Sequence, residues 1–154
     1  MTATSSKTGL AADVRLLVLR ERRDFLRVAR TGRKWAMPGV VVQMAPTPVE
    51  DQVEARAADG GVIRFGLTAS RKVGNAVRRN RARRRLRALA RGLLPEDGVI
   101  GQDYVLIARH TTPERSFDAL IADLKAALAK LKVTHSGTGV PRGKRKISPR
   151  ESDG

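Results

Sequence analysis

A long stretch of the chain carries only positive charge. Between Asp59 and Glu96 there is no acidic residue, yet there are eleven basic ones. Eight of them are arginines within a predicted helix that spans 75 to about 93. The three that precede the helix are Arg64, Arg71 and Lys72, and the eight within it are Arg78, Arg79, Arg81, Arg83, Arg84, Arg85, Arg87 and Arg91. A helix this basic can bury only a narrow side, which limits how the rest of the chain can pack against it.

The apolar side chains of this helix gather on one side when residues are placed about 100° apart. The predicted buried stripe consists of Ala82, Leu86, Leu89, Ala90 and Leu93. Arg79 is the one arginine expected on the apolar side, where it lies in the first turn. The helix is therefore expected to pack by its stripe against a sheet and to present a wide cationic face.

This cationic face predicts a phosphate-bearing partner rather than a solvated helix surface. Pairs such as Arg81 and Arg85 stand four residues apart, and each such pair destabilises an isolated helix by a few tenths of a kcal/mol. A solvated helix normally interleaves glutamates at that spacing, and here there are none. Phosphate groups offset the repulsion because guanidinium forks bind them bidentately.

The charge of the whole chain supports the same interpretation. It has 31 Lys and Arg residues against 15 Asp and Glu residues, which gives a formal net charge of +16. Such an excess weakens the compact state by self-repulsion, and a polyanion relieves it. A basic helix that binds membranes carries bulky apolar residues opposite its charges, whereas the single Trp and all three Phe lie outside 71–91. Nucleic acid is therefore the predicted partner, and no membrane is expected.

Several classes of protein are disfavoured by composition. No apolar run approaches the roughly 18 residues needed to cross a membrane. The first twelve residues do not resemble a secretory signal. The chain has no cysteine, which excludes disulfides and thiolate metal sites. A cytoplasmic location is expected.

The remaining pattern predicts an α+β fold, a two-layer α/β sandwich in the order helix, strand, strand, helix, strand, helix. The helices are expected at 21–31, 75–93 and 112–132, and the strands at 40–44, 62–70 and 104–108. One domain is expected over 15–132, between a disordered N-terminal segment, 1–14, and a basic disordered tail, 133–154. The acidic stretch 47–61 is predicted to be a long exposed loop.

The turn that leads into the central helix is suited to anions. Residues 70–75 connect a predicted strand to the helix start, where backbone N–H groups and the helix dipole attract negative charge. Gly74 permits a backbone conformation that other residues resist. Asn75 is a suitable N-cap.

Residues 65–84 (FGLTASRKVGNAVRRNRARR) closely resemble the signature of the bacterial ribonuclease P protein component. The Arg-Asn-Arg core of that signature corresponds to Arg79, Asn80 and Arg81. The resemblance extends over most of the chain: Phe25 and the residues after it are similar to the family's first helix, and 103–109 to its strand after the central helix.

The resemblance implies properties that composition could not show. It implies a ribosomal-protein-like sandwich with a left-handed crossover between the strands that flank the central helix. It also implies an accessory subunit of a ribonucleoprotein endoribonuclease, whose partner is a large catalytic RNA and whose substrate is precursor tRNA. The RNA is expected to hold the Mg²⁺ ions and to perform the hydrolysis, so no catalytic or metal-binding residue is expected in the protein.

The resemblance also assigns residues to two surfaces. The expected RNA contacts are Arg71, Lys72, Asn75, Arg79, Asn80, Arg81, Arg83, Arg84 and Arg87. The expected cleft for the 5′ leader of precursor tRNA contains Phe25, Lys34 and Trp35. Ala29 and Gln43 occupy positions where family members often carry aromatic residues, and Trp35 is expected to substitute for them. Core packing is the alternative role for Phe25 and Trp35.

Two other functions are alternatives to this one. An autonomous nuclease needs convergent carboxylates, or histidine with a metal, on the basic surface, and the signature segment contains no carboxylate. His110 follows a predicted strand and is interpreted as a loop residue. A ribosomal or general RNA-binding protein shares the charge and the size, and only the Arg-Asn-Arg signature separates it from the ribonuclease P protein.

Overall fold

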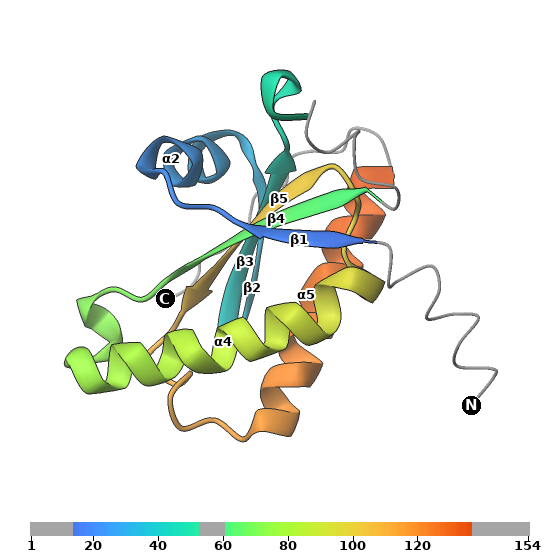
Figure 1. Cartoon of the computed structure of the whole chain (residues 1–154). Coiled ribbons are helices and arrows are strands. Elements are labelled where there is room, and N and C mark those ends of the chain that lie inside the picture. The colour runs from blue at the N-terminus through green and yellow to red at the C-terminus, as the bar shows by residue number, and fades with distance from the viewer. Residues whose placement is uncertain (1–13, 53–60, 137–154) are drawn as a thin grey trace.

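A single mixed sheet organises the molecule in this computed structural model, which describes residues 14–52 and 61–136 (Figure 1). Its five strands lie in the order β1-β4-β5-β3-β2. The strands are β1 (Arg15–Val18), β2 (Arg33–Met37), β3 (Val40–Pro46), β4 (Val62–Thr68) and β5 (Gln102–Ala108). β4 runs parallel to both β1 and β5, whereas β3 is antiparallel to β5 and to β2.

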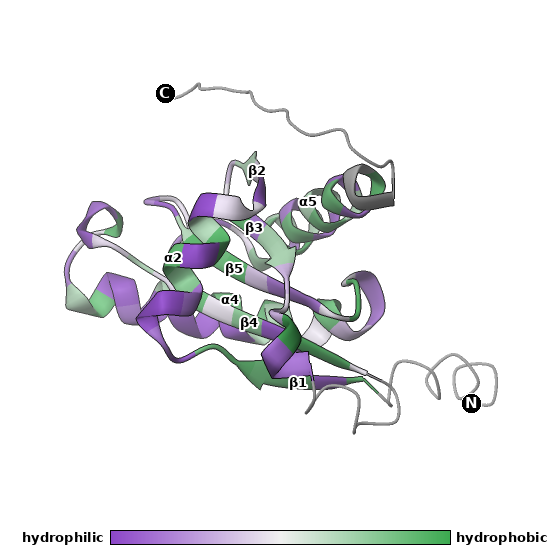
Figure 2. Cartoon of the chain, turned by 90° about the horizontal axis from the view of Figure 1, so that it is seen from above, coloured by the Kyte–Doolittle hydropathy of each residue, from purple (hydrophilic) through white to green (hydrophobic). Residues whose placement is uncertain are grey.

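Helices cover both faces of this sheet. α4 (Ala76–Asp97) and α5 (Phe117–Ser136) pack on one face, where they enclose the larger hydrophobic core. α2 (Arg22–Thr31) packs on the other face, over a small cluster that includes Val28 and Val105. Figure 2 views the molecule from above, with α2 in front of the sheet and α4 behind it. The predicted α+β class is confirmed, and α2 adds a partial third layer to the expected two.

The buried stripe of α4 agrees closely with the one expected from the helical spacing. Ala82, Leu86, Leu89 and Ala90 are buried, whereas Leu93 is only partly buried and Leu94 completes the stripe. They pack against residues of β4 and β5, among them the fully buried Tyr104. Each buried leucine of the stripe stabilises the fold by about 1.5–3 kcal/mol relative to full exposure. Burial of the stripe places most arginines of α4 on the outer side of the molecule.

Two strands were missed by the sequence analysis, and both are edge strands. β1 has only four residues, which is short for a periodic pattern. β2 is mostly exposed and lacks the alternation of a half-buried strand, because its one neighbour is β3. The pairing of Met37 with Val40 leaves a two-residue turn, Pro38–Gly39. A two-residue turn directly before the β-branched run of β3 is typical of a β-hairpin, so it could have indicated that a strand precedes it.

The bounds of two helices also differ from expectation. α4 continues through Pro95 to Asp97, and it ends where the Gly98 N–H donates to the Leu94 carbonyl oxygen at 2.8 Å. α5 begins at Phe117 rather than near 112, because the Ser116 hydroxyl accepts a hydrogen bond from the Ala119 N–H and caps the first turn. The last four residues of α5, from 133 onward, belong to a segment that was expected to be disordered.

Other expectations fall partly or wholly on residues outside the described ranges. These are the N-terminal segment, most of the acidic stretch 47–61, and the tail beyond 136. The beginning of the acidic stretch is described, and it contains the short 3-10 helix η1 (Val49–Asp51). Thr47 is buried there and donates a hydrogen bond to Asp103, so this part is anchored to the sheet.

Candidate nucleic-acid interface

The start of α4 is fixed by local hydrogen bonds. After β4, the Ser70 hydroxyl accepts from the Lys72 N–H at the start of the 3-10 turn η2 (Arg71–Val73). Gly74 follows with φ of +139°, a conformation that L side chains rarely adopt. The Asn75 side chain then accepts from the Arg78 N–H at 3.0 Å. Asn75 is therefore the N-cap that the sequence indicated, and its oxygen is occupied within the protein.

Most arginines of α4 form an outward-facing cationic surface. We define the α4 arginine face as the basic residues of η2 and α4 whose side chains bind neither a carboxylate nor a backbone carbonyl oxygen among the residues described. Its members are Arg71, Lys72, Arg79, Arg81, Arg83, Arg84, Arg87 and Arg91. All are exposed except Arg79 and Arg83, which are half-buried. Asn80 lies within this surface and accepts a hydrogen bond from Arg83 at 2.9 Å.

Two arginines of α4 bind the protein itself instead. Arg78 donates to the carbonyl oxygens of Val73 and His110, each at 3.0 Å, and forms an ion pair with Glu114. Together these contacts tie the beginning of α4 to the loop after β5. The sequence analysis placed Arg78 on the cationic face, but its guanidinium is used for internal support.

Arg85 is the second of these internal arginines. Its Nη1 donates to the carbonyl oxygens of Thr112 and Pro113 at 2.6 and 2.8 Å. The guanidinium carbon also lies 5.8 Å from the ring centroid of Phe117. Partial burial lowers the pKa of Arg85, and the nearby charge of Arg81 lowers it further. Arg85 thus joins α4 to the start of α5 without a carboxylate partner.

Two residues predicted for the leader cleft, Phe25 and Lys34, lie on the opposite face of the sheet. Phe25 of α2 is half-buried above β4, and a Cβ atom at Gly66 would lie 2.5 Å from two atoms of its ring. Glycine at that position therefore lets the ring approach the strand closely. Lys34 pairs with Gln43 across the β2–β3 ladder, and both side chains point to this α2 side of the sheet. Phe25 and Lys34 share one face, as expected.

Trp35 does not lie on that face, so the expectation that it shares one surface with Phe25 and Lys34 is wrong. It pairs with Val42, which is buried in the core under α4 and α5. Successive side chains of a strand point to opposite sides of the sheet, so Trp35 lies on the α5 side while Lys34 lies on the α2 side. The ammonium of Lys130 in α5 lies 5.7 Å from the Trp35 ring centroid.

A buried carboxylate holds the α2 side together. Asp103 of β5 is fully buried, and it accepts hydrogen bonds from Arg64, Arg27 and Thr47. Burial by itself raises the pKa of Asp103, but the hydrogen bonds from Arg64, Thr47 and Arg27 outweigh it and lower the pKa. This network was missed because its members are far apart in the sequence. The charges at Arg27 and Arg64 gave no signal that they share one partner.

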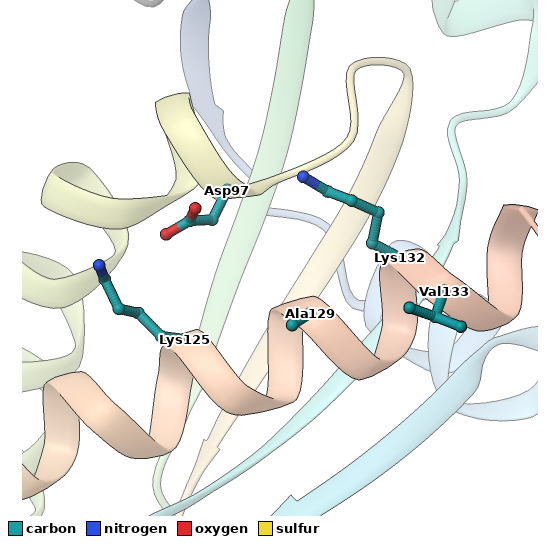
Figure 3. Close-up of a pocket in the computed structure, with 5 residues that line it drawn as sticks. All are labelled: Asp97, Lys125, Ala129, Lys132 and Val133. Carbon is teal, nitrogen blue, oxygen red and sulfur yellow. The ribbon is translucent and has the colours of Figure 1, made fainter.

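A pocket of about 380 Å³ lies between the end of α4 and α5 (Figure 3). Lys125 and Lys132 extend from α5 toward the end of α4, where Asp97 lies, and Ala129 and Val133 complete the lining. It holds one carboxylate and two ammonium groups, without a histidine or hydroxyl group. Within the described ranges, no group of three or more His, Cys, Asp or Glu side chains could hold a metal ion. No helix of that part of the chain is long and apolar enough to span a membrane.

The fold and the α4 arginine face define a basic α+β protein suited to a polyanionic partner. The family model for ribonuclease P matches residues 15–132. A ribonuclease P protein component of Paramagnetospirillum magneticum is 47% identical over 125 residues, which cover 79% of this chain and 90% of that protein. Another, from Ruegeria pomeroyi, is 50% identical over 118 residues and covers 74% and 85%. The chain belongs to the ribonuclease P protein family.

Solved structures agree with this assignment. The ribonuclease P protein of Thermotoga maritima is 27% identical and has a TM-score of 0.57, with 75% of this chain and 94% of that one covered. The Staphylococcus aureus protein, at 24% identity and a TM-score of 0.58, covers 75% and 95% and supports the fold alone. As a member of the family, the chain is a subunit of ribonuclease P, a tRNA-processing enzyme with an RNA partner in its holoenzyme.

Proposed function

We propose that the α4 arginine face binds the catalytic RNA of ribonuclease P, and that the α2 side of the sheet binds the 5′ leader of precursor tRNA. The protein thereby assists endonucleolytic removal of the leader in the cytoplasm. The RNA partner holds the Mg²⁺ ions and performs the hydrolysis in this division of labour.

The observation that carries the proposal is the separation of α4 arginines into two groups. Arg78 and Arg85 donate hydrogen bonds to backbone carbonyl oxygens of the protein, whereas the side chains of the α4 arginine face bind neither a carboxylate nor a backbone carbonyl oxygen in the described ranges. Unneutralised guanidinium groups on one helix repel one another, and phosphates relieve that repulsion while releasing condensed counterions. Arg71, Lys72, Arg79, Arg81, Arg83, Arg84 and Arg87 are the proposed phosphate contacts, and Asn80 the polar group among them.

The leader-binding role depends on the α2 side. Phe25 lies against the sheet with its ring only half-buried, and Lys34 supplies a positive charge on the same face. An aromatic ring contributes about 1–3 kcal/mol per stacked base. The hydrogen bond from Arg27 of α2 to Asp103 of β5 fixes the helix on the sheet beneath this surface.

Reconstitution with the catalytic RNA tests both assignments. Arg81→Ala is expected to weaken assembly with the RNA, and Phe25→Ala to weaken binding of precursor tRNA with a leader but not of leaderless tRNA. Lys125→Ala, an exposed change on α5, serves as the control and should alter neither. Specific 5′ cleavage by the protein alone in Mg²⁺, or an equal loss for leaderless tRNA in Phe25→Ala, contradicts the proposal.

A further inference from the structure

We propose that Arg33, Trp35 and Lys130 form a second binding site for unpaired nucleotides, which takes the part of the 5′ leader that extends beyond the α2 side. We call these three residues the β2–α5 surface. The inference rests on the proposed function, because the leader is its ligand, but it concerns the other face of the sheet.

The ring of Trp35 is placed for stacking rather than for core packing. The residue is 38% exposed, whereas Tyr104 of the core has no exposed surface. Lys130 lies over the ring at 5.7 Å from the centroid. A lysine ammonium is a point charge on a flexible stem, so it can turn to a phosphate while a base takes its place on the ring.

The charge around the ring fits a polyanion. Arg33 points to the same side of β2 as Trp35, and no carboxylate pairs with it among the described residues. Lys130 of α5 adds a second positive charge beside the ring. A strand of RNA at this surface therefore meets the cations Arg33 and Lys130 next to one aromatic ring.

The position of β2 favours the leader over the catalytic RNA as the occupant. β2 is the edge strand next to β3, and α5 lies beside it (Figure 1). α4 packs over β1, β4 and β5, toward the other edge of the sheet. Lys34 and Trp35 are consecutive, and their side chains lie on opposite faces of that edge. A single strand that leaves the α2 side near Lys34 needs only to pass around β2 to reach the Trp35 ring.

Trp35 is the only tryptophan of the chain, so its fluorescence reports on this surface alone. The full-length protein is assembled with the catalytic RNA, and a cleavage-resistant precursor is added with either a short or a long leader. The short leader ends within the α2 side, and the long one extends past β2. We expect the long leader to quench Trp35 emission and the short leader to leave it unchanged.

Variants then assign the effect to particular side chains. Trp35→Ala should reduce affinity for the long leader about fivefold, the lower range for loss of one stacked base, and leave the short leader unaffected. The double change Arg33→Gln with Lys130→Gln retains the ring and should also act only on the long leader. Lys125→Gln removes a charge from the same helix and should act on neither. Melting temperatures confirm that the variants remain folded.

Several outcomes overturn the inference. Trp35 emission that does not change when the long leader is saturating contradicts it. An equal loss of affinity for the short and the long leader in the Arg33→Gln, Lys130→Gln double variant contradicts it as well. Quenching by the catalytic RNA alone, or a blue shift with anionic vesicles and none with RNA, assigns the surface to another partner. Failure of the proposed function can be distinguished from failure of this inference. It would appear as normal RNA assembly in Arg81→Ala and normal leader binding in Phe25→Ala.

Discussion

At the scale of single residues, Asp103 is a fully buried carboxylate that binds two arginines and a threonine. Its two carboxylate oxygens accept from Arg64, Arg27 and Thr47, and none of its side chain is exposed to solvent. Removal of one partner from such a cluster leaves the others buried without compensation, which costs far more than the net stabilisation by the intact cluster.

Asp103→Asn is therefore expected to lower the free energy of unfolding by about 2–4 kcal/mol, since the two guanidinium groups lose their counter-charge. Asp51→Asn is the matched control, because among the described residues Asp51 forms an ion pair with Arg64 alone, at 3.3 Å, from a more exposed position. Its expected cost is below about 1 kcal/mol. Urea unfolding measures both, and equal costs would contradict a dominant role for Asp103.

The same carboxylate predicts how stability depends on pH. The pKa of Asp103 is lowered in the folded protein from 3.8 because hydrogen bonds from its partners outweigh burial. A lowered pKa means that the unfolded chain takes up the proton first, so the stabilisation is complete above pH 3.8 and is lost as the pH falls below it. Stability measured from pH 6 to pH 2 should decline less steeply over this range in Asp103→Asn than in the wild type.

At the scale of elements, the junction of η2 and α4 depends on Gly74. Its φ of +139° is unfavourable for any residue with a Cβ, and a Cβ there would lie 2.5 Å from the Arg78 side chain. Gly74→Ala is expected to destabilise the protein by about 1–3 kcal/mol.

Gly92 lies within α4, and a Cβ atom added there would meet nothing within 4 Å. Gly92→Ala should instead stabilise by about 0.5–1 kcal/mol, and thermal unfolding of the two variants should show opposite signs.

The two groups of α4 arginines predict different losses. Arg85→Ala removes two hydrogen bonds from a charged donor to the loop before α5, and should lower the free energy of unfolding by about 1.5 kcal/mol. Arg84→Ala removes an exposed side chain and should change stability by less than about 0.5 kcal/mol. RNA assembly should show the larger loss in Arg84→Ala when both variants are compared as folded protein. Equal melting temperatures would contradict the internal role of Arg85.

The elements that could be predicted from the sequence are those with a strong periodic signal. The stripe of α4 was predicted because its apolar residues repeat at helical spacing among arginines, and the β-branched runs of β3 and β4 indicated strands. β1 and β2 were missed because edge strands bury little and need no alternation. The start of α5 was misplaced since Thr112 and Pro113 form a turn that Arg85 holds, a contact between distant segments.

In the candidate site, too, local features could be predicted from the sequence and contacts between distant segments could not. Local signals identified the N-cap Asn75, the constrained Gly74 and the face of α4 that carries charge. Strand register determined what sequence could not: it separates Trp35 from Phe25 by placing them on opposite faces of the sheet. Chain topology likewise brings Arg27 and Arg64 to Asp103, and the identity of their common partner cannot be read from spacing.

At the scale of the whole molecule, the charge of +16 is distributed unevenly. The carboxylates in the described ion pairs lie near α2 and the Arg27–Arg64 cluster, or in the segment from Glu114 to Asp123, while the α4 arginine face is left without counter-charges. The cost of this arrangement is self-repulsion in the free protein, which falls when anions bind. Anions should therefore stabilise the free protein through that face in particular.

Sulfate at millimolar concentration is accordingly expected to raise the melting temperature at low ionic strength, because it binds the folded cationic face. In the double variant Arg84→Gln with Arg87→Gln, this increase should be smaller, and the slope of log affinity for the catalytic RNA against log salt should fall by about 1 for each arginine removed. Lys125→Gln, which removes one charge from α5, is the control for net charge alone. The comparison is the loss of sulfate-induced increase in melting temperature for each charge removed. If Lys125→Gln and the double variant show the same loss per charge, the stabilisation depends on total charge and not on the α4 arginine face.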